Sequence, residues 1–198
     1  MAAPVGLDPE QVVAAALEVL DERGRLDAVS LREVAGRLGV RTQSLYAHVD
    51  GADGLRHALA LAGLDALTDV LTAAAIGRSG GDAVAAIVHA YYRFAVDRPG
   101  LYDATLQPPG DDEELGRAIA GVTRPLNLVF ASYGLDERAA VHWYRIVFAG
   151  VHGFAMLRRD GLLTMPGDPE ESLAHMVDAF VHQLEIEVAG NGRRKRRP

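Results

Sequence analysis

The stretch that most constrains the fold of this chain runs from Ser30 to Val49, SLREVAGRLGVRTQSLYAHV. Its first half places apolar residues at the spacing i, i+3, i+4, i+7, on one face of a two-turn helix: Leu31, Val34, Ala35 and Leu38. Ser30 with Glu33 three residues later predicts a capping box at the start of that helix. Gly39 predicts its end, because a helix C-terminus commonly needs a residue that tolerates positive φ.

A second two-turn helix is predicted to follow, with Leu45 and Val49 facing inward. Its outer face is polar and carries Thr42, Gln43, Ser44 and Tyr46. Ala35 is small enough for two helices to cross, and Leu45 would fill the space between them. This spacing predicts a helix-turn-helix whose second helix can enter the major groove of DNA. An ordinary helical hairpin within a core is the alternative.

The composition sets broad limits on what the chain can be. It has 198 residues, 49% of them hydrophobic and 24% charged, which is typical of a globular protein. The absence of cysteine rules out disulfides, cysteine–metal sites and thiol chemistry. The sequence shows no signal-peptide pattern, and we expect no apolar run to reach membrane-spanning length. We therefore expect a cytoplasmic protein with no membrane partner.

The charge is unevenly distributed along the chain. The formal net charge is −7, and five of the 20 basic residues lie in 193–197 (RRKRR), so the rest of the chain carries −12. Five arginines and two carboxylates give residues 23–48 a local charge of +3: Arg23, Arg25, Arg32, Arg37 and Arg41 against Asp27 and Glu33. An acidic body with a small basic region is consistent with a protein that touches DNA through one module.

The rest of the chain predicts helices and no strand. An N-terminal helix capped by Asp8 and ended by Gly24 would complete a three-helix module. Further helices are expected over about 53–75, 82–98, 101–106, 115–133, 136–159 and 168–189. The predicted fold is all-α with about nine helices. Its predicted domains are a helix-turn-helix domain (8–52), a helical bundle for ligand binding and dimerisation (53–189) and a basic, disordered tail (190–198).

The predicted helix from 137 to 159 is apolar on two faces, so it must be covered on two sides. One face carries Ala140, Tyr144, Val147, Val151 and Phe154. The other has heptad-like spacing with small residues that would let another helix approach closely. Together with two residues of the final helix, it is the predicted dimer interface: Trp143, Ile146, Gly150, Gly153, Leu157, Met176 and Phe180.

With these residues in place, the chain resembles the TetR family of bacterial transcriptional regulators. The resemblance is most specific over residues 8–60, where the turn and the segment from Ser44 to Val49, followed by Leu55, resemble that family's recognition helix. The resemblance is looser in the rest of the chain, at Tyr91–Ala95, Pro99–Tyr102 and His152–Phe154.

The resemblance implies a homodimer that represses transcription from a palindromic operator and is released by a small-molecule effector. It implies DNA contacts, to bases or phosphates, by Arg32, Arg41, Thr42, Gln43, Ser44, Tyr46 and His48. The family usually has a lysine where this chain has Ala52, so one phosphate contact is missing.

An effector site is predicted among the aromatic and leucine side chains of the C-terminal helices, because apolar clefts between helices are typical small-molecule sites. The candidate lining residues are Leu67, Leu71, Tyr91, Tyr92, Tyr102, Phe130, Tyr144 and Phe148. Plain core packing is the alternative for each of them. Arg93, Arg145 and His89 are possible orienting groups, and the expected ligand is a neutral or weakly polar aromatic or acyl-like molecule.

Other functional classes find little support in the sequence. His175, Asp178 and His182 share one side of the last helix, which could form a metal site, but a solvated face is the preferred interpretation. No Glu-x-x-His pair, serine elbow or phosphate loop occurs, so we expect neither an enzyme nor a cofactor. The alternative to a DNA-binding regulator is a helical small-molecule-binding dimer without operator-specific DNA binding.

Overall fold

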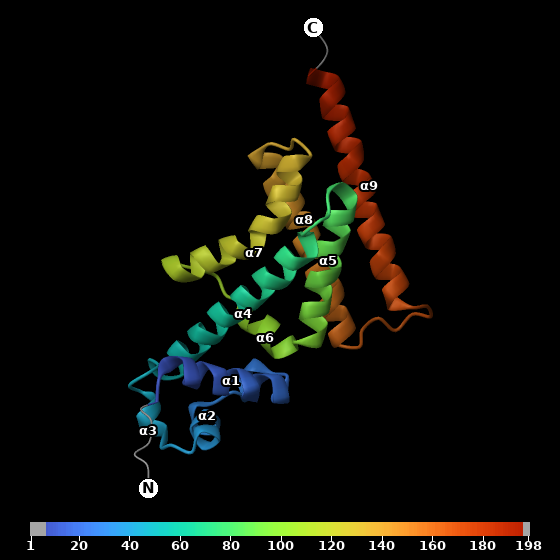
Figure 1. The fold of residues 1–198 in the computed structure, drawn as a ribbon. Helices are drawn as coiled ribbons and strands as arrows, with labels where there is room; N and C mark the ends of the chain where they lie inside the picture. Colours follow the sequence, from blue (N-terminus) through green and yellow to red (C-terminus); the bar gives the residue numbers. More distant parts are fainter. Residues whose placement is uncertain (1–6, 196–198) are drawn as a thin grey trace. The chain divides into compact units, whose positions relative to one another are not determined.

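The computed structural model describes residues 7–195 of the chain, with side chains to residue 190. Within those residues it has nine α-helices, one 3-10 helix and no strand, which confirms the all-α prediction (Figure 1). The elements are α1 (Pro9–Arg23), η1 (Leu26–Ala28), α2 (Leu31–Leu38), α3 (Thr42–Leu45), α4 (Gly51–Ala75), α5 (Gly80–Asp97), α6 (Pro99–Thr105), α7 (Glu113–Ser132), α8 (Glu137–Arg159) and α9 (Pro169–Lys195).

The start and end of α1 follow from its capping residues. The Asp8 carboxylate accepts a hydrogen bond from the Gln11 amide (2.8 Å), and the Gln11 side chain accepts one from the Asp8 amide (3.2 Å). These two bonds satisfy amides that have no partner within the helix. Gly24 ends α1 in the left-handed conformation, with φ of 66°. Both predicted ends of this helix are therefore confirmed.

The cap of α2 forms only half of the predicted capping box. The Ser30 hydroxyl accepts a hydrogen bond from the Glu33 amide (3.2 Å), as expected. The Glu33 carboxylate does not return to the Ser30 amide but pairs with the Arg23 guanidinium at 2.8 Å. A charged partner outweighs a neutral backbone amide, because charge-assisted hydrogen bonds are stronger. Gly39 ends α2 with φ of 67°, which confirms the predicted turn glycine.

The chain divides into two compact units that do not coincide with the predicted domains. The first comprises Met1–Ala66 and Asp97–Ile119, and the second Leu67–Val96 and Ala120–Pro198. The predicted boundary at residues 52 and 53 therefore falls inside the first unit. The reason is that α6 packs against α1 and η1, and the N-terminal part of α4 belongs to the same unit, which sequence periodicity does not reveal.

In the first unit, α6 lies against the end of α1 at a position that has no room for a side chain. A β-carbon added to Gly100 would lie 2.7 Å from Leu20 Cδ1 and 3.0 Å from the backbone nitrogen of Arg25. Leu20 itself is fully buried. Arg98, next to α6, pairs with Asp21 of α1 at 2.8 Å. Helix α1 is thus supported by a helix that follows it by more than 70 residues in sequence.

The second unit is built around α5, α8 and α9. Its buried residues include the inner faces of α5 and α8: Val84, Ile87, Val88, Tyr91, Val147, Val151 and Ala155. Small residues allow α9 to approach both neighbours. A β-carbon at Gly150 of α8 would lie 2.6 Å from Phe180 Cζ, and one at Gly81 of α5 would lie 2.5 Å from Val181 Cγ1.

Two expectations about the chain's ends and hydropathy need correction. Helix α9 continues to Lys195, so the backbone of 190–195 is helical rather than disordered; residues 196–198 lie outside the described residues. Helix α4 is long and apolar enough to cross a membrane by length and composition alone, with a mean hydropathy of 1.5 over its most apolar 18-residue window. A third of that window, 33%, is buried in the fold, and a core helix passes the same test.

Candidate nucleic-acid interface

The predicted recognition helix is shorter than the sequence suggests. Helix α3 is a single α-helical turn, Thr42–Leu45, rather than two turns. Hydrogen bonds from the His48 and Val49 amides to the Leu45 carbonyl (2.9 and 3.0 Å) carry the backbone on to Val49. Leu45 is fully buried and Val49 nearly so, so both face inward as predicted.

The junction between α2 and α3 has the small residues that a steep crossing requires. Ala35 is buried, with only 2% of its surface exposed. The Val40 amide donates to the Ala35 carbonyl at 3.0 Å, which closes the turn after Gly39. These contacts hold α3 against α2 and direct the side of α3 opposite Leu45 toward solvent. The geometry is that of a helix-turn-helix.

The predicted DNA-contacting residues form an accessible row on and beside α3. Arg32, Arg41, Gln43, Ser44 and Tyr46 are exposed, and Thr42 and His48 are half-buried. Tyr46 is the most informative, because 60% of this large ring is exposed. An aromatic side chain with a phenolic hydroxyl in that position is available to a phosphate or a base edge. All seven predicted residues are therefore at least partly accessible, six of them in the segment 41–48 and Arg32 on the neighbouring helix α2.

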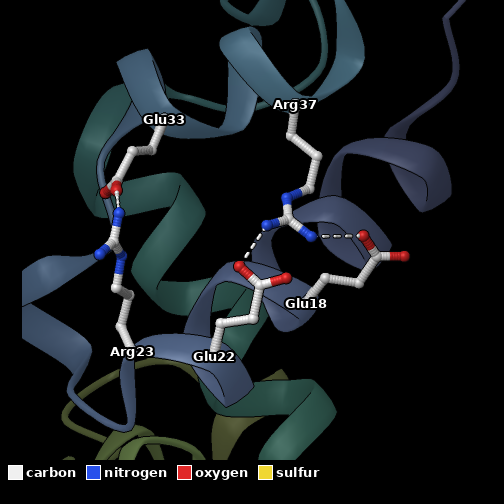
Figure 2. A network of polar contacts seen from close by, with 5 residues as sticks. All are labelled: Glu18, Glu22, Arg23, Glu33 and Arg37. Carbon is white, nitrogen blue, oxygen red and sulfur yellow. Dashed lines mark hydrogen bonds and ion pairs between the residues drawn. The ribbon is translucent and has the colours of Figure 1, made fainter.

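An ion-pair network joins α1 to α2 behind this row (Figure 2). Arg37 of α2 donates to Glu18 at 3.0 Å and also to Glu22, both on α1. Its hydrogen bond lowers the pKa of the Glu22 carboxyl, with the Arg37 and Arg23 charges adding to that effect. Arg23 of α1 pairs in turn with Glu33 of α2 at 2.8 Å. Figure 2 shows that ion pairs join the two helices at two places: the arginine belongs to α1 in one of them and to α2 in the other.

This network reduces the positive charge that is free to meet DNA. Arg23 and Arg37 are engaged with carboxylates, and Arg25 pairs with Asp27 at 2.6 Å. Within residues 7–195, no ion pair involves Arg32 or Arg41. Of the three arginines behind the local charge of +3, Arg37 is offset by Glu18 and Glu22, which precede the counted stretch, so Arg32 and Arg41 remain.

We expect the salt dependence of DNA binding to reflect these two arginines. Arg32→Gln should lower the slope of log K against log salt by about 0.9 per bound chain, because one fewer phosphate is neutralised. The measurement is a DNA titration at several salt concentrations. As a control, the double change Arg25→Gln with Asp27→Asn keeps the net charge and should leave the slope unchanged. An equal change of slope in both variants would contradict the assignment.

The predicted effector site is only partly assembled. Leu71, Tyr91, Tyr144 and Phe148 line one apolar cavity in the second unit, as predicted, but its volume is only about 20 Å³. That is room for about one water molecule. Tyr144 stacks on Phe148 with ring centres 6.0 Å apart, and burial raises the pKa of the Tyr144 phenol. In this conformation the residues pack as core.

The other predicted lining residues lie elsewhere. The Tyr92 hydroxyl donates to Glu170 at 2.9 Å, and Tyr92 packs against Phe154. Burial, followed by the neighbouring Glu170, raises the pKa of the Tyr92 phenol. Tyr102 is fully buried in the first unit, and Leu67 and Phe130 are buried without lining the cavity. The possible orienting groups Arg93, Arg145 and His89 do not line it either.

A larger cleft in the second unit was missed by sequence reasoning. It has a volume of about 590 Å³ and is lined by the C-terminal end of α4, the following turn and the middle of α7: Thr68, Thr72, Ala75, Ile76, Arg78, Ser79, Gly121, Arg124, Pro125, Leu128, Val129 and Ser132. The sequence feature that could have indicated this cleft is Pro125 inside a predicted helix, preceded by Arg124. Helix periodicity alone does not show which two helices face one another.

The predicted dimer interface separates into an internal part and an open part. Trp143 is buried and its indole donates to Glu187 of α9 at 2.9 Å, so it joins α8 to α9 within the chain. A β-carbon at Gly150 would lie 2.6 Å from Phe180 Cζ and 3.5 Å from Met176 Sδ, so both residues of α9 pack against α8 within the chain. Ile146 and Leu157 are 50% and 42% exposed, and nothing lies within 4 Å of a β-carbon at Gly153.

The remaining polar candidates on α9 face solvent. His175, Asp178 and His182 are all exposed. Among the residues that the structure describes, no group of three histidine or carboxylate side chains is placed to hold a metal ion.

Comparison with known proteins agrees with this geometry. Residues 84–180 match the family model described as "Tetracyclin repressor-like, C-terminal domain". The chain is 34% identical over 165 residues to the uncharacterized HTH-type transcriptional regulator Rv0681 of Mycobacterium tuberculosis, covering 82% of this chain and 75% of that protein. It is 31% identical over 186 residues to the uncharacterized HTH-type transcriptional regulator YobS of Bacillus subtilis, covering 94% and 97%.

A solved structure shares the fold. A single-residue variant of TetR from Acinetobacter baumannii AYE, crystallised in complex with minocycline, matches with a TM-score of 0.63 at 21% identity. The match covers 94% of this chain and 97% of that one. The helix-turn-helix, the C-terminal helices and the curated relatives all lead to the same conclusion: this chain is a member of the TetR family of HTH-type transcriptional regulators.

Proposed function

We propose that this protein binds operator DNA as a homodimer, represses transcription and is released by a small-molecule effector. The observation that carries the DNA-binding part is the exposed polar row of α3, held over a buried Leu45. A regulatory role rather than catalysis, and a cytoplasmic location, are part of the same proposal.

Residue chemistry supports a division of labour on the DNA. Gln43 has the side-chain amide that pairs bidentately with adenine, and Arg32 or Arg41 can pair with guanine or a phosphate. Thr42, Ser44, Tyr46 and His48 supply short or rigid polar groups for phosphates and flanking bases. Ala52 cannot supply the phosphate contact that lysine makes in the family, and Arg56, exposed one helical turn later, is the nearest candidate to replace it.

Gln43→Ala should reduce discrimination between the operator and a variant with the contacted base changed, by about 1–3 kcal/mol. Tyr46→Phe should weaken binding to all duplexes by about 0.5–1.5 kcal/mol, because it removes one hydrogen bond without changing the ring. Fluorescence-anisotropy titrations with the operator and a scrambled duplex measure both quantities. Unchanged affinities in both variants would contradict the assignment of α3 as the recognition element.

The dimer is proposed to form through the open side of α8 together with α9. The exposed Ile146 and Leu157 and the open surface at Gly153 support this, because exposed apolar side chains beside a small residue allow close helix packing. Met176, Phe180, Trp143 and Gly150 would support that face from within the chain. A two-fold dimer presents two copies of the recognition segment, residues 42–49. This requires a palindromic operator with half-sites about 34–36 Å apart, or a multiple of that.

Release by an effector follows from the continuity of α4. Its first part belongs to the first unit and its last part to the second. A ligand that binds better when α4 is displaced disfavours the arrangement that binds DNA, and by linkage DNA weakens that ligand to the same degree. The TetR variant solved with minocycline supports a small-molecule effector for this chain as well.

A second candidate is a helical small-molecule-binding dimer that does not recognise an operator. Ala52 and the engagement of Arg23, Arg25 and Arg37 in internal ion pairs favour it. The same anisotropy titrations separate the two candidates. Preference for the chain's own upstream DNA over a scrambled duplex supports the regulator, and equal binding to both supports the second candidate.

A further inference from the structure

We propose that the cleft between the end of α4 and the Pro125 segment of α7 binds an amphipathic anion. The ligand class has a hydrocarbon body and one carboxylate or phosphate head group. This inference rests on the proposed function, because it identifies the effector site of a regulator whose effector site is otherwise unassigned. It also replaces the neutral ligand that the aromatic residues suggest.

The cleft has the size of a ligand site. Its volume of about 590 Å³ compares with about 20 Å³ for the aromatic cavity in the same unit. Small-molecule sites generally have volumes of about 300–1,000 Å³. All of its lining residues belong to the second unit, so the cleft is a property of that unit alone.

One wall of the cleft exposes hydrocarbon. Ile76 is 71% exposed and Leu128 is 61% exposed, and both line the cleft. Pro125 and Val129 are buried and provide apolar surface beneath them. Large exposed aliphatic side chains that flank one concavity are a surface that a hydrocarbon chain would remove from water.

The polar part of the lining is cationic. Arg78 and Arg124 are exposed, and no aspartate or glutamate lines the cleft, in a chain whose net charge is −7. Arg78 donates to the Ala74 carbonyl at 2.9 Å, which holds its guanidinium beside the end of α4. A guanidinium has donors to spare after one such bond, and its planar fork fits a carboxylate or a phosphate. Thr68 and Thr72 add hydroxyl groups on the α4 side.

The backbone of α7 adds a polar group and controls the width of the cleft. Pro125 has no amide hydrogen, so the carbonyl of Gly121 has no helical donor four residues later. Gly121 lines the cleft, and a β-carbon there would lie 3.2 Å from Thr68 Oγ1. The glycine therefore permits a close approach of α7 to α4, and the place where the two helices meet forms the floor of the cleft.

The location suits an effector. Thr68, Thr72 and Ala75 lie on α4, which begins at Gly51 directly after the recognition segment. A ligand held between α4 and α7 acts on the end of the helix that connects the two units. Its binding free energy can therefore bias the position of the DNA-binding module.

The test is a calorimetric titration of the full chain with three 12-carbon probes: dodecanoate, dodecyl phosphate and dodecanol, each below its aggregation concentration. We expect both anions to bind and the alcohol to bind about 10-fold more weakly or worse, because it lacks the charge that the arginines recognise. Arg124→Gln should weaken the anions about 10-fold and leave the alcohol unchanged. The control Arg117→Gln removes an exposed arginine of the same helix, paired with Glu113 at 3.5 Å, and should change nothing.

Three results would overturn the proposal: no saturable binding of either anion, equal affinity for dodecanol, or the same affinities for Arg124→Gln and Arg117→Gln. Leu128→Asp provides an independent check, since a carboxylate in the cleft should abolish anion binding while the sedimentation coefficient stays that of the unchanged protein. Altered sedimentation of this variant would instead show that the cleft is an interface between copies of the chain, and would overturn the proposal.

Failure of this inference can be distinguished from failure of the proposed function. DNA binding is measured by anisotropy without any probe, and then with dodecanoate added. Anion binding in a protein that ignores DNA supports the ligand site and removes the regulatory proposal. Anion binding that leaves DNA affinity unchanged overturns the effector role of the cleft. Release of DNA by dodecanoate but not by dodecanol supports both.

Discussion

Leu45→Ala is expected to destabilise the protein by about 2–5 kcal/mol and to abolish DNA binding. The side chain is fully buried between α2 and α3. Its removal leaves a cavity that the short α3, with its single turn, cannot fill without losing its place against α2. The free energy of unfolding in urea, followed by circular dichroism, measures the first effect, and an operator titration measures the second.

Leu162→Ala is the matched control for that change. Leu162 follows α8 and is 60% exposed, so the same truncation should alter the free energy of unfolding by about 0.5 kcal/mol or less. Operator affinity should stay the same. Similar losses in the two variants, or full operator affinity for Leu45→Ala, would contradict the placement of Leu45 beneath the recognition segment.

Gly100→Ala is expected to destabilise the first unit by about 1–3 kcal/mol. The added methyl group would meet Leu20 Cδ1 at 2.7 Å and the backbone atoms Gly24 C and Arg25 N at 3.0 Å. Leu20 could yield, but the backbone after α1 cannot move without disturbing the left-handed turn at Gly24. Unfolding in urea should show the loss.

Gly36→Ala is the control for Gly100→Ala, because it makes the same substitution in the same unit. Gly36 lies inside α2, and nothing lies within 4 Å of an added β-carbon. The change should stabilise the protein by about 0.5–1 kcal/mol through helix propensity. If both glycine variants were stabilised, the close approach of α6 to α1 would be wrong.

Local structure was largely predictable from the sequence because helix ends depend on neighbouring residues. Asp8 caps α1 as expected, and Asp136, at the predicted start of its helix, caps α8 by accepting from the Ala139 amide at 2.9 Å. Gly24 and Gly39 end their helices in the left-handed conformation. The inward face of the helix-turn-helix was predictable for the same reason, since periodicity places Leu45 and Val49 on one side.

Pairing between distant side chains was not predictable. Glu33 was expected to complete a capping box, but Arg23, ten residues earlier, attracts it. Trp143 is a candidate for the dimer interface, and the structure adds a hydrogen bond from its indole to Glu187 of the same chain. Both bonds join residues on different helices, and helix periodicity does not indicate which side chains of two helices meet.

The sequence alone determined that this chain is helical, where most of its helices begin and end, with α3 and the end of α9 as exceptions, and which short segment carries the polar groups proposed for DNA. Those properties depend on capping, periodicity and turn chemistry, which act over a few residues. Only the tertiary structure decided which arginines near α3 remain outside ion pairs. It also decided that the aromatic residues pack together and leave a cavity of only about 20 Å³, and where the cleft of about 590 Å³ lies. These depend on which helix faces meet, and helix periodicity identifies a buried face without identifying its neighbour.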